Sequence, residues 1–332
     1  MMIKRVFTVL LMLVLSIGIT SQSLAQKTFE LCSGVVVDPG RHLAYVMNTE
    51  GGIDAVELNR GTLAWSTDQA CKPLALIGDR LICQVEPQAV GNKLEIVILN
   101  VKERGKPEIA KSERLPSNVR VSISESLDSS YTIYARVHGG DLFMFWKYSF
   151  RPIKGTAPPD LEIDRKTGKA VYASEIKSPQ NTSGTIRMEL SSGTMSFVKK
   201  EDVPAALAPR SPDIAANERL PGVPGRQFIA ADSAHILCSE RAADDSVWDK
   251  YRWTIYNRTT AKPVAEIRSY RSQAPFFVHG TQVIYETGPY IRQTQKGLLH
   301  EPLKIRAVSI KTGRELWSYP IRDTTYRGPY PG

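Results

Sequence analysis

The sequence predicts an all-β protein, a β-propeller of four-stranded antiparallel blades. Two stretches that lie far apart are near-copies of each other: "AVELNRGTLAW" at residues 55–65 and "AVSIKTGRELW" at residues 307–317. Each alternates apolar and polar residues, turns at a glycine and ends on a tryptophan, which is the pattern of a β-hairpin. Hairpins that recur at intervals of about 40 to 50 residues are typical of propeller blades.

The outer hairpin of the repeat is recognised by a turn glycine followed four residues later by an aromatic residue. Glycine suits this turn because the backbone needs a positive φ there. Four copies follow the pattern: Gly61 with Trp65, Gly168 with Tyr172, Gly193 with Phe197, and Gly313 with Trp317. Two weaker copies turn near Gly105 and at Ala261. The recurrence predicts that the outer half of each blade has this form.

A second type of hairpin precedes most of the outer ones and completes a four-stranded unit. Its turns are built from Asp, Gly, Pro, His and Ser. The units start near Glu30, Pro73, Tyr131, Phe228 and Pro275. Five complete units are thus predicted, and the length also allows six or seven. The longer intervals indicate an insertion or a degenerate extra blade.

The aromatic residues that end the outer hairpins are predicted to be structural. A single four-stranded sheet cannot bury both of its faces, but sheets packed radially cover one another. A large side chain at the same place in every repeat supplies apolar area between neighbours. We therefore expect Trp65, Tyr172, Phe197 and Trp317 to dock adjacent blades. Stacking on a cofactor is the alternative for these side chains.

The N-terminus has the form of a secretory signal peptide. Lys4 and Arg5 precede an apolar run from Val6 to about Ile19, and Ser23-Leu24-Ala25 supplies small residues before a cut. This pattern predicts cleavage near Ala25-Gln26, with residues 1–25 as the signal, and a periplasmic or secreted protein. A retained membrane anchor is the alternative, and no later stretch is long enough to span a bilayer.

The remaining chain is predicted to be one propeller domain, residues 26–332. Two segments interrupt the repeat. Residues around 152–183 hold an extra outer-type hairpin and are interpreted as an insertion, and residues around 201–225 form a Pro-rich loop. A long projection from a propeller is a candidate contact site for a partner.

The charge and the cysteines narrow the class of protein. The formal charge is +9, but the basic residues are scattered, whereas a nucleic-acid binder concentrates them on one face. We expect no nucleic-acid partner. Cys32, Cys71, Cys83 and Cys238 allow disulfides in an exported protein. Cys83 and Cys238 occupy the same place in two repeats, which favours buried free thiols, whereas the state of Cys32 and Cys71 stays open.

No pattern of catalytic or metal-binding residues is found. The histidines at 42, 138, 235, 279 and 300 include no pair at the close spacing of metal ligands. His138, His235 and His279 lie in or beside inner hairpin turns, either as ordinary turn residues or as a ring of ligands at the propeller mouth. Their unequal offsets from the turns favour ordinary turn residues. The sequence thus predicts no catalytic residue, no metal and no cofactor.

The repeat resembles that of the pyrroloquinoline-quinone-like β-propellers, whose docking motif has the form Ala-x-Asp-x-x-Thr-Gly-x-x-x-Trp. Ala307, Thr312, Gly313 and Trp317 match it, with Ser309 in place of Asp. The copy at 55–65 matches at Ala55, Gly61 and Trp65, with Glu57 for Asp and Arg60 for Thr. The resemblance covers residues 30–322 and implies the fold more strongly than an activity.

That family includes quinoprotein dehydrogenases and non-catalytic propellers such as the scaffold lipoprotein of the outer-membrane β-barrel assembly machine. The resemblance implies for the dehydrogenases about eight blades, a vicinal cysteine pair and a calcium site. This chain has no adjacent cysteines, and it also lacks the lipoprotein's anchoring cysteine.

We therefore expect an exported, monomeric, non-enzymatic propeller that binds a protein or another cell-envelope component. The alternative is a degenerate quinoprotein dehydrogenase, or another propeller enzyme with its site at the channel mouth. The centre of the propeller distinguishes the two: convergent carboxylate, histidine and arginine side chains favour an enzyme, and a plugged apolar channel excludes one.

Overall fold

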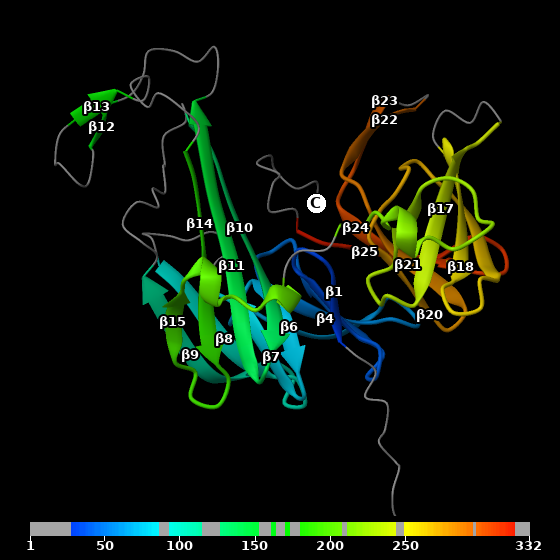
Figure 1. Ribbon diagram of the computed structural model, residues 1–332. Helices are drawn as coiled ribbons and strands as arrows, with labels where there is room; N and C mark the ends of the chain where they lie inside the picture. Colours follow the sequence, from blue (N-terminus) through cyan, green and yellow to red (C-terminus); the bar gives the residue numbers. More distant parts are fainter. Residues whose placement is uncertain are drawn as a thin grey trace, which may run out of the picture.

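The computed structural model describes residues 28–85, 93–114, 127–152, 161–163, 170–172, 180–207, 211–243, 249–294 and 297–322. These residues form five antiparallel sheets that follow one another in chain order (Figure 1). Each sheet starts with its innermost strand and continues outward. The predicted unit starts fall in or directly before these innermost strands. The prediction of a β-propeller of four-stranded blades is confirmed.

The first and second sheets are built from consecutive strands. The first sheet has the order β1 (Phe29–Cys32), β2 (Val35–Asp38), β3 (Leu43–Met47), β4 (Ile53–Glu57) and β5 (Leu63–Thr67). The second has the order β6 (Lys72–Ile77), β7 (Arg80–Gln84), β8 (Lys93–Asn100) and β9 (Lys106–Arg114). The first sheet thus carries one strand more than a four-stranded blade, and the additional strand is the innermost one.

The third and fourth sheets are joined by a connection with three short 3-10 helices. The third sheet consists of β10 (Leu127–His138), β11 (Asp141–Pro152), β14 (Gln180–Glu189) and β15 (Met195–Val198). The connection holds η3 (Lys200–Asp202), η4 (Ala205–Leu207) and η5 (Ala216–Glu218). The fourth sheet consists of β16 (Gln227–Ile229), β17 (His235–Arg241), β18 (Tyr251–Asn257) and β19 (Pro263–Ser269). The connection coincides with the predicted Pro-rich loop.

The fifth sheet and the third share one peculiarity, a separate hairpin between their second and third strands. The fifth sheet consists of β20 (Phe276–His279), β21 (Gln282–Thr287), β24 (Lys304–Ser309) and β25 (Glu315–Pro320), and β22 (Tyr290–Thr294) pairs with β23 (Gly297–Glu301). In the third sheet, β12 (Leu161–Ile163) pairs with β13 (Ala170–Tyr172). Because equivalent connections leave the blades at the same end, both hairpins project from one end of the propeller (Figure 1).

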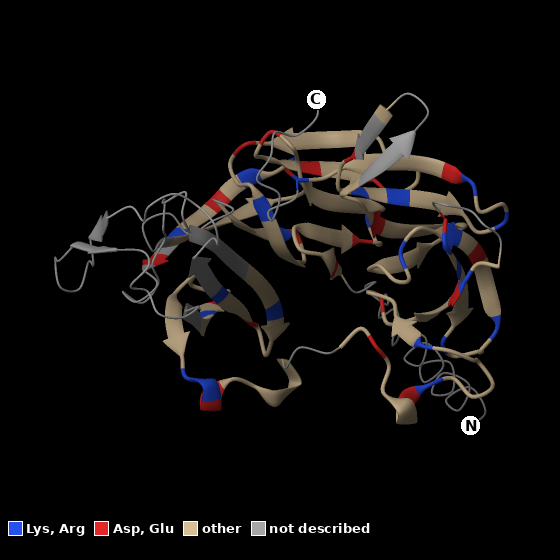
Figure 2. Ribbon diagram, turned by 90° about the horizontal axis from the view of Figure 1, so that it is seen from above, with Lys and Arg blue, Asp and Glu red and all other residues tan. Residues whose placement is uncertain are grey.

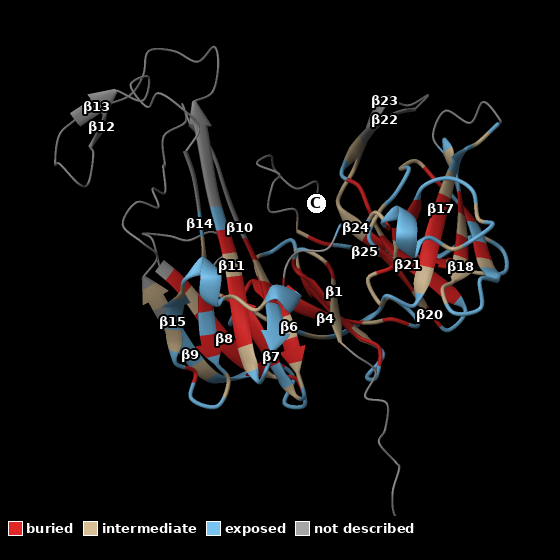
Figure 3. Ribbon diagram, in the orientation of Figure 1, coloured by how far each residue is buried: buried red, intermediate tan, exposed pale blue. Residues whose placement is uncertain are grey.

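Apolar side chains fill four of the junctions between sheets. Separate buried clusters join the first sheet to the second, the second to the third, the fourth to the fifth, and the fifth back to the first. Figure 3 shows the buried residues concentrated along the strands. Most sheets therefore bury apolar side chains on both faces, as radial packing of blades requires.

The junction between the third and fourth sheets is different. None of the buried clusters among the described residues contains side chains of both sheets. The face of the fourth sheet that is turned toward this junction packs instead on the connecting segment, where Ile214 lies against Ile236 and Cys238. Figure 1 shows the third sheet on one side and the fourth on the other, with the first sheet between them. Among the described residues, this junction therefore lacks the shared apolar cluster that the other four junctions have.

A β-bulge distinguishes the outer hairpins of four sheets from that of the third. In the first sheet, Val56 pairs with Leu63 and Ala55 pairs with Trp65, so that Ala64 is the extra residue. The second, fourth and fifth sheets have the same shift. The pairing of β14 with β15 has no shift. Since one residue of register moves a side chain to the opposite face, the same glycine-to-aromatic spacing gives opposite orientations.

The prediction of a signal peptide at residues 1–25 lies outside the described residues. Within the part of the chain that the structure describes, no helix is long and apolar enough to cross a membrane. In the view of Figure 2, Lys and Arg are interspersed with Asp and Glu along the described strands and loops. The scattered charge predicted from the sequence is thus seen in three dimensions.

Candidate functional site

The centre of the propeller is filled by strand β1. The ring of Phe29 packs edge-on against Phe277 of the fifth sheet, with 5.3 Å between ring centroids. Leu31 is 5% exposed. The Thr28 hydroxyl donates a hydrogen bond of 2.8 Å to the carbonyl of Leu76 in the second sheet. β1 therefore pairs with β2 and also packs against two other blades at the place where a propeller channel would run.

Ionisable side chains from three sheets gather around β1. We call Glu30, Cys32, Lys72, Arg136 and Glu286 the central cluster. Glu30 of β1 accepts a hydrogen bond of 3.0 Å from Nη1 of Arg136 in the third sheet. Lys72, 3% exposed, donates from Nζ to the carbonyl of Ile133, at 2.9 Å. These contacts tie the first and second sheets to the third.

The protonation of the central cluster is governed by burial. Burial raises the pKa of Glu30, and Arg136 opposes that shift. Burial lowers the pKa of Lys72, and the nearby Glu30 carboxylate opposes it. Burial raises the pKa of Cys32 well above its usual range, and Glu286 raises it further. A thiol of this kind stays protonated and is a poor nucleophile.

The residues at the centre do not fit a quinone cofactor. A flat ring system needs a space between side chains at the propeller axis, and β1 occupies that position with paired charges on one side and Phe29 and Leu31 on the other. Within the described residues, no three His, Cys, Asp or Glu side chains are placed to hold a metal ion together. The centre is a packed, ion-paired plug, and we derive no chemical step from it.

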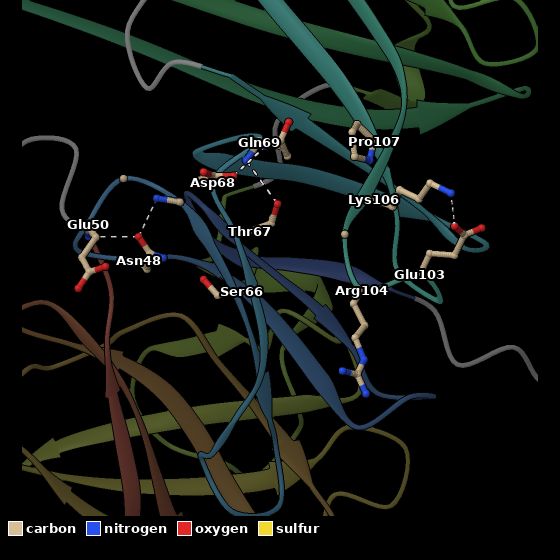
Figure 4. Close-up of a pocket in the computed structure, with 13 residues that line it drawn as sticks. Asn48, Glu50, Ser66, Thr67, Asp68, Gln69, Glu103, Arg104, Lys106 and Pro107 are labelled. Atoms are coloured by element: carbon tan, nitrogen blue, oxygen red, sulfur yellow. Dashed lines mark hydrogen bonds and ion pairs between the residues drawn. The ribbon is translucent and has the colours of Figure 1, made fainter.

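A polar groove of 620 Å³ lies at the periphery between the first and second sheets (Figure 4). It is lined by the β3–β4 turn at residues 48–52, the end of β5 with the residues after it (66–69), and the β8–β9 turn at residues 103–107. The side chain of Asn48 shapes the first turn, because its Oδ1 accepts hydrogen bonds from the amides of Glu50 and Gly52.

Both signs of charge line this groove. Glu103 and Lys106 form an ion pair of 2.9 Å across their own turn. Glu50, Asp68 and Arg104 are exposed. In Figure 4, no interaction with another drawn residue is marked for the Arg104 guanidinium. The groove thus carries exposed side chains of both charges.

Two of the predicted docking residues, Trp317 and Trp65, contact the turn glycine of the next blade. Trp317 is 8% exposed, and its Nε1 donates to the carbonyl of Leu58 at 3.1 Å. A Cβ added to Gly61 would lie 2.6 Å from the Trp317 ring. Trp65 is half-buried, and a Cβ on Gly105 would lie 2.8 Å from its ring.

The other two predicted docking residues lie elsewhere. Phe197 is 47% exposed and pairs directly with Ile186, on the face of the third sheet that packs against the second. Tyr172 ends β13 in the inserted hairpin rather than in a blade, and its side chain lies outside the described residues. Blade docking by the whole set of four stays a prediction.

All four cysteines are free thiols, and Cys71, Cys83 and Cys238 are buried. Cys83 and Cys238 are therefore core thiols, as their place in the repeat predicted. His42 lies in a turn, whereas the other four histidines lie within or at the ends of strands. His138 ends β10, His235 starts β17, and His235 Nδ1 lies 3.3 Å from the Asp232 carboxylate.

One contact was missed by the sequence analysis: His42 of the first sheet meets His279 of the fifth, with 3.1 Å between Nδ1 and Nε2. Both residues lie at inner hairpin turns, of the first and the last blade. A propeller closes by packing its last blade against its first, so that residues at equivalent turns of these two blades were candidates for a contact, although no motif in the sequence marks this pair.

Comparisons with known proteins find only low similarity. No protein-family model and no curated protein matches the sequence. Among solved structures, the chain is similar to a quinohemoprotein alcohol dehydrogenase from Pseudomonas putida, with 9% identity over 84% of this chain and 57% of that one and a TM-score of 0.24. It is also similar to a europium-containing methanol dehydrogenase, with 11% identity over 84% and 67% and a TM-score of 0.22.

A third similar structure is the computationally designed Ika8 protein, with 8% identity over 90% of this chain and 88% of that one and a TM-score of 0.30. The likeness to quinoprotein dehydrogenases thus extends to solved structures at low similarity. It carries no argument about activity.

Proposed function

We propose that this protein is an exported, non-enzymatic propeller that binds another protein of the cell envelope. The centre shows a feature of each alternative: Phe29 and Leu31 of β1 fill it, while carboxylates and an arginine of the central cluster converge beside them. The observation that carries the proposal is that this space is filled and that the charges beside it are engaged within the fold. Glu30 is paired with Arg136, and Lys72 donates to a backbone carbonyl, so that these charges at the axis are held by the fold itself. Binding is then left to the periphery and to the inserted hairpins.

Two features support a protein as the ligand. The groove between the first and second sheets is polar and open, and its walls are turns that carry mixed charges. Hairpins β12–β13 and β22–β23 leave the same end of the propeller and enlarge the surface that a partner could cover. Loops and insertions on a rigid scaffold commonly carry binding.

The proposal is tested by site-specific photocrosslinking in the native host. A photoreactive amino acid replaces Asp68 in the groove, and a second variant carries it at Lys262, an exposed residue in the outer turn of the fourth sheet. We expect a discrete adduct with another envelope protein from position 68 and none from position 262. The photoreactive residue is also placed in each of the two inserted hairpins. The same adducts from positions 68 and 262, or no adduct from position 68 or either hairpin, would contradict a protein-binding role.

A further inference from the structure

His42 and His279 bring two imidazole nitrogens together across the contact between the first and last blades. Nδ1 of His42 lies 3.1 Å from Nε2 of His279, and the ring centroids are 5.1 Å apart. The two residues are separated by 237 positions in the chain. His279 is 7% exposed, whereas His42 is exposed. The pair is therefore anchored on one side and open to solvent on the other.

The backbone at His42 forms a tight turn. His42 has a φ of 56°, in the left-handed region that histidine adopts more readily than most residues. Arg104, Ser233 and Ala261 adopt the same region in other turns, so that the position of the His42 ring, and not its φ, carries the inference. The conformation directs the imidazole of a β2–β3 turn residue onto the neighbouring blade.

Among the described residues, Nδ1 of His42 and Nε2 of His279 have each other as their hydrogen-bonding partner. Phe277 lies beside His279, with 6.5 Å between ring centroids. The nearest charged neighbours in sequence pair among themselves, since Arg41 binds both Asp38 and Asp79. Among the described residues, no carboxylate is recorded at hydrogen-bonding distance from either imidazole. When both imidazoles are neutral, one of the two facing nitrogens carries a proton and donates it. The other nitrogen accepts it with its lone pair, which therefore points into the contact.

The separation of the nitrogens matches that of two ligands on one transition-metal ion. With metal–nitrogen bonds of about 2.0 to 2.1 Å, two imidazoles lie about 2.9 Å apart in square-planar and about 3.4 Å apart in tetrahedral coordination. The distance of 3.1 Å falls between these values. We propose that His42 and His279 form a two-histidine site for a divalent transition-metal ion of the Cu²⁺ or Zn²⁺ class.

The site would join the first and last blades through a metal. Water would complete the coordination on the exposed side of His42, because no third protein ligand is placed there among the described residues. A ligand that binds only the folded chain stabilises it, so that bound metal raises the unfolding temperature. Metal binding requires unprotonated nitrogens, and protons therefore compete with the metal ion for the site.

The experiment uses the full mature chain without an affinity tag, treated with a chelator and dialysed. Zn²⁺ alone is titrated by calorimetry, and Cu²⁺ alone is followed by electron paramagnetic resonance, which resolves coupling to ligand nitrogens. We expect one ion per chain and coupling to two imidazole nitrogens. His279→Gln and His42→Asn should each weaken Zn²⁺ binding by at least about tenfold.

The controls separate a ligand from a merely structural residue. Asn tolerates the left-handed backbone at position 42, so His42→Asn is expected to fold with an unchanged circular dichroism spectrum. His235→Gln, which removes a histidine paired with Asp232, should leave binding unchanged. Absence of binding by the wild-type chain, or binding that survives both His42→Asn and His279→Gln, would overturn the proposal.

Discussion

The contact between the fifth and first sheets and the junction between the third and fourth sheets use similar sequence elements to opposite effect. At the first contact, the buried Trp317 ring covers Gly61, and its Nε1 bonds to Leu58 and Gln282. Tyr319 adds a bond of 2.6 Å from its hydroxyl to Asp54. At the second, Phe197 is half exposed, and no buried cluster of the described residues spans the two sheets.

The difference shows that a docking aromatic needs more than the right spacing. The third sheet has the same turn as the first, since Gly193 donates to Glu189 as Gly61 donates to Glu57. It lacks the bulge that shifts the register by one residue. Phe197 therefore lies on the face toward the second sheet, and the face toward the fourth sheet has no aromatic residue from β15. Four changes test this comparison.

Truncating Trp317 should have the largest effect. Trp317→Ala removes a buried ring at the contact that joins the chain ends, and it leaves the carbonyl of Leu58 without the indole donor. We expect a loss of about 3 to 5 kcal/mol in the free energy of unfolding, measured with urea. A loss below about 1 kcal/mol would mean that this contact does not hold the propeller together.

The turn glycines give a matched pair of changes. Gly61 has a φ of 68°, and Ala261 occupies the equivalent turn of the fourth sheet with a φ of 53°. Gly61→Ala should cost about 1 to 3 kcal/mol, because a Cβ both strains the backbone and strikes the Trp317 ring. Ala261→Gly should change stability by less than about 1 kcal/mol. Thermal unfolding of both variants measures the difference between the two turns. Equal changes in stability would contradict a special requirement for glycine at position 61.

Glu30 links the plug to the third sheet and predicts a pH effect. Burial raises the pKa of Glu30 above its ordinary value of 4.5. The folded chain then binds more protons than the unfolded chain between the two pKa values, so that this group makes stability fall as pH rises through that window. In Glu30→Gln the slope should be absent. Urea unfolding from pH 4.5 upward compares the two chains, and identical slopes would contradict a raised pKa of Glu30 in the folded chain.

The smallest effect is expected for Phe197. Its ring is 47% exposed, and surface changes away from specific contacts usually alter stability by less than about 0.5 kcal/mol. Phe197→Ala should therefore be near neutral in the same urea assay that detects Trp317→Ala. A cost comparable to that of Trp317→Ala would contradict the exposed position of Phe197 and show that its ring is buried against the second sheet in solution.

Part of the candidate site could be predicted from residue patterns and part could not. The core thiols Cys83 and Cys238 were predictable, because they occupy equivalent places in two repeats. The central cluster was not, since Glu30, Lys72 and Arg136 belong to three different blades and have no common motif. The pairing of His42 with His279 likewise depends on which blades touch, and their distance in the chain gives no sign of it.

By itself, the sequence determined the hairpins, their order and the five units, because alternation and turn glycines are local properties of the backbone. Only the tertiary structure decided which faces meet. A bulge shifts the register by one residue and so decides which neighbouring blade an aromatic side chain faces. The spacing from Gly193 to Phe197 does not reveal whether a bulge is present. The plug of the centre by β1 also depends on packing, since a strand becomes central only when other blades surround it.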